Sequence, residues 1–406
     1  MSQLKVDTIR HTSATSDAIT LASDGTATAK ITGGITQGLS NRNMITNGEM
    51  LVKQRPGDIS FAHDGTRVGN VVDCFKFSMT TCDSYDCTVS HANSGPVTDA
   101  GGFSKSFKVT TGTAESAIAV SEYSYIDTRL EGWDCQRLYY GDANAKAATL
   151  SFWVKSSVTG TFGFSIYRGE RPEDRIINVP YAISSANTWE KKTLAIPGDT
   201  AQAVGNTNTE RMRFMWTLWA GTGMTSAGAS TSWTNYSGDA TKFQAGHVTN
   251  TLATTAGATF ELTGVQFEEG TIAPDFEHTS YSDALAKCQR YYYLIGGTEN
   301  SQYSITGAGH MGLNGSDKNI KTWISFPVSM RTTPSAAVVN VNEFRGDCTG
   351  GAEDITFNAL WAAASNHNFA WIDFSSSALS GVGNGTSCVV YARSGSNGKI
   401  GMSAEL

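Results

Sequence analysis

The chain has 406 residues, of which 17% are charged, and its 30 lysines and arginines against 37 aspartates and glutamates give a net charge of −7. This length is enough for two or three domains with a sizeable core. Nucleic-acid-binding proteins usually carry a basic patch, so the absence of a basic run argues against a DNA or RNA partner. No apolar run approaches the ~18 residues of a membrane helix, and the first residues lack a signal-peptide pattern. We therefore expect synthesis in a reducing cytoplasm and no membrane insertion.

Residues 1–40 differ from the rest of the chain. The stretches LKVDTIR and DAITLASDGTATAKITGG contain short alternating strands around an Asp24-Gly25 turn, and Gly33-Gly34 predicts a hinge. A segment this small cannot bury a core of its own, so we expect it to pack against identical copies of itself. The apolar residues expected at that interface are Leu4, Val6, Ile9, Ile19 and Leu21.

An alternation of apolar and polar residues dominates residues 61–267. In LSFWVKSS, Leu150, Phe152 and Val154 share one face, and the same pattern recurs in FKFSM, FGFSIY and RFMWTLW. Such alternation between turn residues is typical of half-buried antiparallel strands. We therefore predict an all-β fold whose central part is an antiparallel β-sandwich. In FELTGVQF the apolar register switches at Gly264, which predicts a β-bulge.

The stretch TSYSDALAKCQRYYY changes to a helical period. Ser280 and Asp283 have the spacing of a capping box, which marks the start of a helix. We predict a short connecting helix over residues 280–293. Four residues recur at the spacing of one helix face: Tyr281, Leu285, Cys288 and Tyr292.

The period of two returns after this helix in KTWISFPV, AAVVNV, FAWIDF and CVVYAR. Residues 294–406 are therefore predicted to form a second, smaller β domain. Three consecutive aromatic side chains at the end of the helix cannot all face one small core, so we expect them at a domain or subunit interface. They are Tyr291, Tyr292 and Tyr293.

The seven cysteines stand at irregular spacing and indicate neither a metal knuckle nor a disulfide framework. Cys82 and Cys87 in CDSYDC could lie across a hairpin, but a free thiol is the favoured interpretation for both. No cofactor is indicated. We predict no metal site, because no ligand series has calcium-loop spacing, although a stabilising Ca²⁺ held by loop carboxylates stays open.

Six stretches, in order between Asn41 and Tyr293, resemble a module of tail-fibre and related structural proteins of marine bacteriophages. They are NMITNGEM, YSYIDTRLEGWD, AKAATLSFWVKSS, SSANTWEKKTLAIPGDT, ATFELTGVQFEEGTIAPDFEH and ALAKCQRYYY. The stretch LKVDTIRHTSATSDAITLASDGTATA also resembles the leader that often precedes such modules in cyanophage virion proteins. The cysteines at 74, 82, 87 and 135 are not part of this pattern, and residues 294–406 match no specific fibre tip.

This resemblance implies a division of the chain and a function. It implies an attachment and trimerisation segment at 1–40, a carbohydrate-binding-like jelly roll at 41–279, the connecting helix and a C-terminal tip. It also implies a homotrimeric tail fibre, assembled in the host cytoplasm, that joins other virion proteins through residues 1–40 and recognises host-surface glycan. A head fibre or decoration protein without a receptor role, and a polysaccharide-degrading fibre, are the two alternatives.

The sequence contains little that indicates an enzyme. GAGHMG fits the G-x-G-x-x-G pattern, but LNGSDKN follows it where a dinucleotide-binding fold needs a helix. Glycoside cleavage needs two carboxylates across a sugar cleft. Strand periodicity places Asp127 and Glu131 on one face, but charges on a strand face are the favoured interpretation. We therefore expect no catalytic residues.

A sugar-binding site needs an aromatic platform beside polar groups that donate and accept hydrogen bonds. The strand YSYIDTRLEG is expected to present such a face outward, and LSFWVKSS and FGFSIY each add one aromatic residue. The rings could instead pack under loops or at a trimer interface, and the Asp–Arg pair could be a structural ion pair. The candidate glycan-binding residues are Tyr123, Tyr125, Asp127, Arg129, Trp153 and Tyr167.

Overall fold

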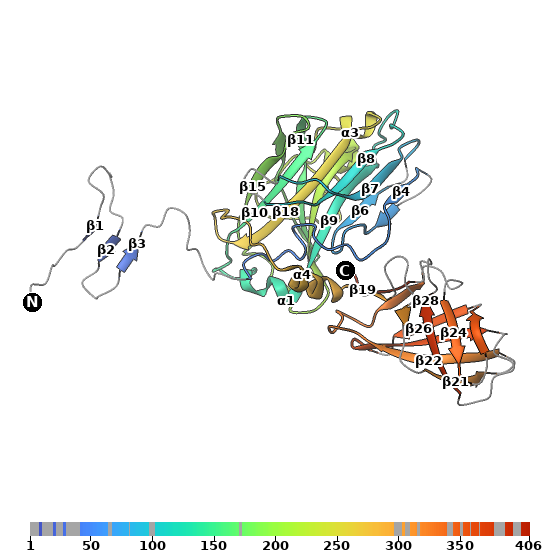
Figure 1. Ribbon diagram of the computed structural model, residues 1–406. Coiled ribbons are helices and arrows are strands. Elements are labelled where there is room, and N and C mark those ends of the chain that lie inside the picture. Colours follow the sequence, from blue (N-terminus) through green and yellow to red (C-terminus); the bar gives the residue numbers. More distant parts are fainter. Residues whose placement is uncertain are drawn as a thin grey trace, which may run out of the picture.

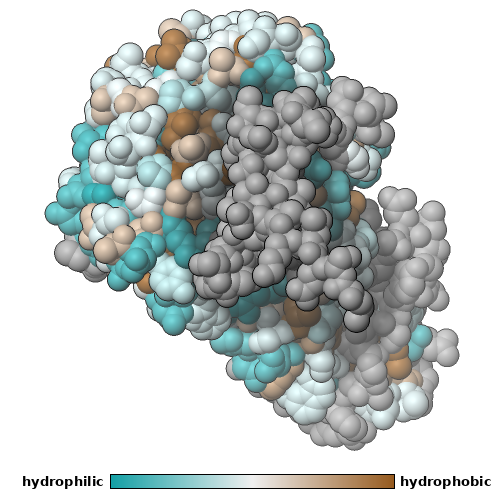
Figure 2. Space-filling view, turned by 90° about the vertical axis from the view of Figure 1, so that its left-hand side faces the viewer, coloured by the Kyte–Doolittle hydropathy of each residue, from teal (hydrophilic) through white to brown (hydrophobic). Residues whose placement is uncertain are grey.

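The computed structural model shows two β-rich units joined near a short helix, with a separate group of short strands at the N-terminus (Figure 1). Seen from the side of those N-terminal strands, the larger unit has hydrophobic residues gathered near the middle of a mostly polar surface (Figure 2). The structure describes the backbone of residues 8–9, 19–21, 27–29, 41–63, 67–80, 82–96, 102–169, 173–295, 303–304, 309–314, 317–338, 344–349, 352–357, 359–364, 366–376, 386–392 and 399–406.

Three short strands form an antiparallel sheet near the N-terminus: β1 (Thr8–Ile9), β2 (Ile19–Leu21) and β3 (Ala27–Ala29). The pair β2–β3 flanks the predicted turn, although Asp24 and Gly25 lie outside the described residues. Leu4, Val6 and the glycine hinge also lie outside them, as do the side chains of Ile9, Ile19 and Leu21. The predicted self-association of residues 1–40 therefore stays a prediction.

The larger unit is a sandwich of two antiparallel sheets. The strands of the first are β4 (Ile59–Phe61), β7 (Cys87–Ala92), β8 (Ser106–Thr111), β10 (Ala148–Ser156), β15 (Glu190–Ile196) and β18 (Thr259–Glu269). Those of the second are β5 (Arg67–Gly69), β6 (Lys76–Met79), β9 (Tyr123–Glu131), β12 (Phe164–Arg168), β13 (Arg175–Asn178), β16 (Glu210–Ala220) and β17 (Thr234–Asn235). Their orders are β15-β10-β18-β8-β7-β4 and β17-β13-β12-β16-β9-β6-β5. The predicted all-β sandwich is confirmed.

The core lies between these sheets and follows the predicted alternation. Leu150, Phe152 and Val154 are fully buried, and the ring of Phe152 meets that of Trp216 edge-on at 5.7 Å. The predicted bulge is also confirmed, because the register between β10 and β18 shifts at Gly264, which has a φ of 60°. A Cβ there would lie 2.9 Å from Cδ1 of Trp153, so only glycine fits this approach.

Short elements connect the strands of the larger unit. They are the hairpin β11 (Gly160–Phe162) and β14 (Tyr181–Ile183), the helical turns α1 (Gly132–Cys135), α2 (Thr222–Thr225) and α3 (Thr251–Thr254), and the 3₁₀ turns η1 (Gln136–Leu138) and η2 (Ala240–Lys242). Two of them, α2 and η2, belong to a long connection after β16 that returns across the second sheet. This connection contributes to the site described below.

The helix α4 (Tyr281–Gln289) follows the sandwich. Its N-cap is Ser280, whose hydroxyl accepts a hydrogen bond from the Asp283 backbone N–H at 3.1 Å, as the capping box predicts. The helix ends at Gln289 rather than at residue 293. Residues after it enter β19 (Tyr292–Ile295), because β29 (Ile400–Ser403) offers an antiparallel partner to these aromatic and β-branched residues.

The three consecutive tyrosines meet three different neighbours. The Tyr291 hydroxyl donates to Oε1 of Glu131 at 2.8 Å, at the end of β9. The guanidinium of Arg55 lies 3.6 Å from the ring centre of Tyr292. The ring of Tyr293 contacts Phe326, in the core of the smaller unit, at 6.0 Å. This stretch therefore contacts both units.

The smaller unit holds two antiparallel sheets. One has the order β19-β29-β23, where β23 is Ser335–Val338. The other contains β20 (Tyr303–Ser304), β21 (Gly309–Asn314), β22 (Asp317–Ser325), β24 (Phe344–Cys348), β25 (Ala352–Thr356), β26 (Ala359–Ala364), β27 (Phe369–Ser376) and β28 (Ser387–Ala392). Its own hydrophobic cluster includes Ile320, Phe344 and Phe374.

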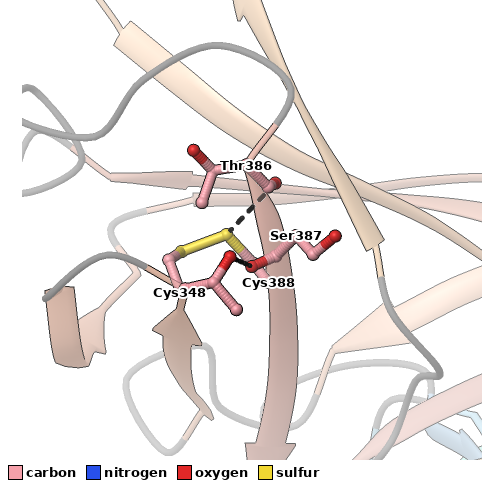
Figure 3. The surroundings of a disulfide bond; sticks show 5 residues. Cys348, Thr386, Ser387 and Cys388 are labelled. Carbon is pink, nitrogen blue, oxygen red and sulfur yellow. Dashed lines mark hydrogen bonds between the residues drawn. A yellow bond between two sulfur atoms is a disulfide. The ribbon is translucent and has the colours of Figure 1, made fainter.

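One disulfide joins β24 to β28, which corrects the expectation that the cysteines form no disulfide (Figure 3). Cys348 and Cys388 face each other in register with Cα atoms 4.1 Å apart, so pairing of the strands brings the two thiols together. Cys82 and Cys87 form no disulfide, as predicted, and neither do Cys74, Cys135 and Cys288.

Residues 404–406 lie between the two units. The Arg331 guanidinium donates to the carbonyls of Ala404 and Glu405 at 2.7 and 2.8 Å. From the larger unit, Arg55 forms an ion pair with the Glu405 carboxylate at 2.7 Å. Charge-assisted hydrogen bonds from both sides therefore hold this stretch in place.

Candidate functional site

The second sheet of the sandwich gathers a cluster of aromatic rings on its outer side. Tyr123 and Tyr125 stand two residues apart on β9, and their rings stack with centres 5.7 Å apart and planes 9° apart. Tyr167 projects from β12, two strands away, and pairs in register with Arg213 of β16. Since residues two apart on a strand share a face, the sequence pattern explains why the first two rings meet.

The connection after β16 completes this cluster. Phe243, just after η2, contacts Tyr123, Tyr125 and Tyr167 with ring centres 6.0–6.2 Å away. Tyr236 lies edge-on to Tyr167 at 5.4 Å. We call the five rings the aromatic face, and its members are Tyr123, Tyr125, Tyr167, Tyr236 and Phe243. All of them except Tyr125 keep part of their surface in contact with solvent.

Local hydrogen bonds fix the connection against the sheet. The Asp239 carboxylate caps η2 by accepting from the Thr241 backbone N–H at 3.1 Å. Asn178 of β13 donates its side-chain amide to the carbonyl of Lys242 at 2.9 Å. The side chains of Thr217 and Gln244 also form a hydrogen bond. Phe243 therefore stands between two anchored neighbours, so its ring has a defined position.

Polar groups border the aromatic face. The Tyr167 hydroxyl donates to Oδ2 of Asp174 at 2.5 Å. The guanidinium carbon of Arg213 lies 5.9 Å from the Tyr167 ring centre, within cation–π range, and Arg213 also forms an ion pair with Glu210. Within the described part of the chain, the hydroxyls of Tyr123 and Tyr236 have no hydrogen-bond partner.

The tyrosines of the aromatic face keep their protons at neutral pH. Burial, reinforced by the Asp127 carboxylate, raises the pKa of Tyr125 to about 12. Burial also raises the pKa of Tyr123 and of Tyr236, and burial with the hydrogen bond to Asp174 raises that of Tyr167. Each hydroxyl therefore keeps its proton. That of Tyr167 is donated to Asp174, whereas the hydroxyls of Tyr123 and Tyr236 can both donate and accept a hydrogen bond. Apolar ring faces beside such hydroxyls suit the alternating C–H and O–H groups of a sugar.

The charged end of β9 is closed rather than open, which corrects the expected outward face. Asp127 is 1% exposed, and Nε of Arg129 donates to its Oδ2 at 2.6 Å. Arg129 also donates to Glu210 and to the Leu406 carbonyl oxygen, both at 2.7 Å. Burial would lower the pKa of Arg129, but the Asp127 and Glu210 carboxylates raise it. Asp127 and Arg129 therefore form a structural ion pair, which was the alternative to a role in sugar binding.

The other carboxylate weighed for catalysis is buried too. Glu131 is 1% exposed and accepts two hydrogen bonds of 2.7 Å from Arg290, just after α4. This contact fastens the helix to the end of β9. Among the described residues, no group of three or more His, Cys, Asp or Glu side chains could hold a metal ion. No helix in the same residues is long and apolar enough to cross a membrane.

Trp153 stands apart from the aromatic face. It is half-buried on β10, in the first sheet, whereas the aromatic face belongs to the second. The structure thus brings together Tyr123, Tyr125 and Tyr167 and separates Trp153 from them. Sequence reasoning missed Tyr236, Phe243 and Arg213. Tyr236 and Phe243 lie in a connection without periodicity, and Arg213 could be found only from the strand register.

Comparisons with known proteins give weak similarities. No protein-family model matches the chain, and no curated protein matches it. Among solved structures, the enzymatically active domain of tailspike protein 4 from bacteriophage CBA120 overlaps with a TM-score of 0.29 and 12% identity, over 56% of this chain and 22% of that one.

Two further structures overlap as weakly. A family 11 carbohydrate-binding module from Clostridium thermocellum, in complex with a mixed-linked tetrasaccharide, gives a TM-score of 0.24 and 11% identity over 53% of this chain and 98% of its own. A putative sugar-binding protein from Bacteroides thetaiotaomicron gives a TM-score of 0.28 and 9% identity, over 56% of this chain and 100% of its own. Overlaps this weak say nothing about what the present chain binds.

Proposed function

We propose that this protein is a non-enzymatic structural protein of a bacteriophage virion, a homotrimeric tail fibre that recognises host-surface glycan through the aromatic face. The phage assignment is supported by the six sequence stretches between Asn41 and Tyr293 that resemble tail-fibre modules. The glycan assignment rests on one observation: five rings and four neutral hydroxyls are held together on one sheet face. Assembly takes place in the host cytoplasm, and residues 1–40 attach the fibre to the virion.

The geometry of the aromatic face explains how a sugar is held. Partly exposed rings of Tyr123, Tyr167 and Tyr236 offer apolar contact to the C–H faces of a pyranose. The hydroxyls of Tyr123 and Tyr236 are available for its hydroxyl groups, and Arg213 adds a donor at the border. The rings are held by neighbouring strands and an anchored connection, so little side-chain entropy is lost on binding.

Binding of the full-length protein to immobilised surface polysaccharides of candidate bacterial hosts tests this function. Tyr123→Ala and Tyr167→Ala are each expected to weaken binding at least about tenfold, or ~1.4 kcal/mol, because each removes part of the platform. Tyr139→Ala is the matched control, since Tyr139 is 56% exposed and lies outside the aromatic face. Equal binding by all four proteins contradicts the glycan assignment.

Light scattering on the full-length protein tests the trimer. We expect the mass of three chains, and a chain that starts at Asn41 should lose this state if residues 1–40 hold the subunits together. A trimer in both proteins moves the assembly interface to the connecting helix and the smaller unit. A monomer in both contradicts the fibre and favours the decoration protein.

A further inference from the structure

Two tryptophans stand side by side on the smaller unit. Trp323 of β22 and Trp371 of β27 face each other in register, and their rings meet edge-on with centres 5.2 Å apart. Trp323 is 67% exposed. At this exposure, the apolar ring of Trp323 is in contact with water. The ring of Trp371 supports it from one side.

Polar side chains occupy the next pair on the same face. Lys321 lies two residues before Trp323 on β22, and Asp373 lies two residues after Trp371 on β27. Lys321 and Asp373 also pair in register, so strand alternation puts all four side chains on one side of the sheet. Nζ of Lys321 lies 3.7 Å from Oδ2 of Asp373 and 5.8 Å from the Trp371 ring centre. Nδ2 of Asn319 donates to the same Asp373 oxygen at 3.1 Å.

Two acceptor atoms at this place are unsatisfied. Oδ1 of Asp373 and Oδ1 of Asn319 are buried and have no hydrogen-bond partner among the described residues. Asn319 as a whole is 4% exposed. A buried acceptor without a donor is unfavourable, so each atom needs a donor from outside the described residues, such as a water molecule or a ligand hydroxyl. Hydroxyl groups are such donors.

Regular strands that pack on a buried core support this face. The alternate residues of the two strands point to the core of the smaller unit, and Ile320, Ile372 and Phe374 are fully buried there. The two strands pair continuously from Lys318 to Ser325. The tryptophans and the polar groups therefore stand on regular strands rather than on a loop, which favours a preorganised binding site.

We propose that this face, with Trp323, Trp371, Lys321, Asp373 and Asn319, is a second saccharide-binding site, which we call the tryptophan platform. It takes a neutral pyranose whose C–H face lies on Trp323 and whose hydroxyls donate to Asp373 and Asn319 and accept from Lys321. The ligand is neutral because Lys321 and Asp373 already balance each other's charge, so an acidic sugar would leave Asp373 facing a like charge. The site is independent of the aromatic face.

A binding experiment on the full-length protein tests the tryptophan platform. The probes are printed neutral gluco-, manno- and galacto-oligosaccharides, with oligogalacturonates as the acidic comparison. We expect Trp323→Ala to lower the affinity for the preferred neutral oligosaccharide at least tenfold and Asp373→Asn to lower it three- to tenfold. Trp133→Ala is the matched control, because Trp133 is also an exposed tryptophan, at 53%, but lies on the larger unit.

Further variants separate this site from the aromatic face and from a folding defect. In a Tyr167→Ala background, Trp323→Ala should lower neutral-oligosaccharide binding by the same factor as in the wild type, and Trp323→Phe should restore part of what Trp323→Ala loses. Equal neutral-oligosaccharide binding by wild type and Trp323→Ala, or no binding by wild type, overturns the proposal. A change of oligomeric mass in Trp323→Ala also overturns it, because the face would then be a contact with a second copy.

Discussion

The two units of this protein are stabilised in different ways. In the larger unit, rings such as Phe152, Phe164 and Trp216 meet between two sheets, and its cysteines form no disulfide. Among the described residues, the core of the smaller unit has fewer large side chains, and a disulfide joins Cys348 to Cys388. The buried fraction of the surface grows with domain size, so a small unit relies more on a covalent link than a large one.

The two candidate sites also differ in how their residues are brought together. The aromatic face of the larger unit is built from β9 and β12, which flank β16 in one sheet, and from a connection that packs against them. The tryptophan platform of the smaller unit stands on two adjacent strands, and Trp323 is 67% exposed. The aromatic face therefore depends on tertiary packing of a connection, whereas the tryptophan platform depends on the register of two strands.

The largest effect is expected from the core of the larger unit. Phe152→Ala removes a fully buried ring that contacts Tyr181 at 5.1 Å and Trp216 at 5.7 Å. We expect a loss of about 3–5 kcal/mol in the free energy of unfolding, measured by urea denaturation. Phe152→Leu should lose clearly less, because it leaves a smaller cavity. Equal losses in the two variants would contradict ring packing as the source of stability.

Removing the disulfide of the smaller unit should lower the free energy of unfolding somewhat less. Replacing Cys348 and Cys388 by serine removes a link across 40 residues of sequence, and about 2–4 kcal/mol of stability is expected to be lost. Calorimetry should show a lower melting temperature for the smaller unit and an unchanged one for the larger. Cys82→Ser is a control, since this thiol is free. An unchanged smaller unit would remove the contrast between the two units.

A pH dependence is expected where the units meet. Burial raises the pKa of Asp73 to about 7, although Arg55 and Gln54 oppose the shift. The folded state therefore binds this proton more tightly than the unfolded state, whose aspartate has a pKa near 4. Stability from this group is fully present below about pH 4 and is lost as the pH rises to about 7.

Asp73→Asn isolates this effect. The free energy of unfolding of the wild type should fall by about 3 kcal/mol relative to the variant between about pH 4 and pH 7. Urea denaturation at a series of pH values measures the difference. Parallel curves for the two proteins would show that Asp73 titrates normally in the folded state.

The smallest effect is expected at the helix between the units. Ser280→Ala removes the hydroxyl that caps α4 and should cost about 1 kcal/mol. Ser280→Asp restores an acceptor at the N-terminus and should recover most of that loss. Hydrogen exchange of the amides in the first turn of α4 reports the change locally, and unchanged protection in Ser280→Ala would argue against the cap.

The parts of the fold that depend on local patterns could be predicted from the sequence. Alternation in LSFWVKSS placed Phe152 in the core, the register switch placed a bulge at Gly264, and the spacing of Ser280 and Asp283 placed the start of α4. The end of α4 could not be predicted, because Tyr292 and Tyr293 join a strand whose partner, β29, lies more than a hundred residues later.

The sites show the same limit. The period of two correctly put Tyr123 and Tyr125 on one face, but it could not show that Asp127 is covered by residues far away in the sequence. Tyr236 and Phe243 join the aromatic face through a connection without a pattern. The link between Cys348 and Cys388 likewise depends on the pairing of β24 with β28. Such contacts arise from tertiary structure alone.

The most direct test of glycan recognition is a crystal structure of the full-length protein with the polysaccharide fragment that binds it best. We predict a sugar ring against Tyr123, Tyr167 and Tyr236, with its hydroxyl groups hydrogen-bonded to the tyrosine hydroxyls. A fragment bound only at other places on the protein, with the aromatic face empty, would contradict the central claim.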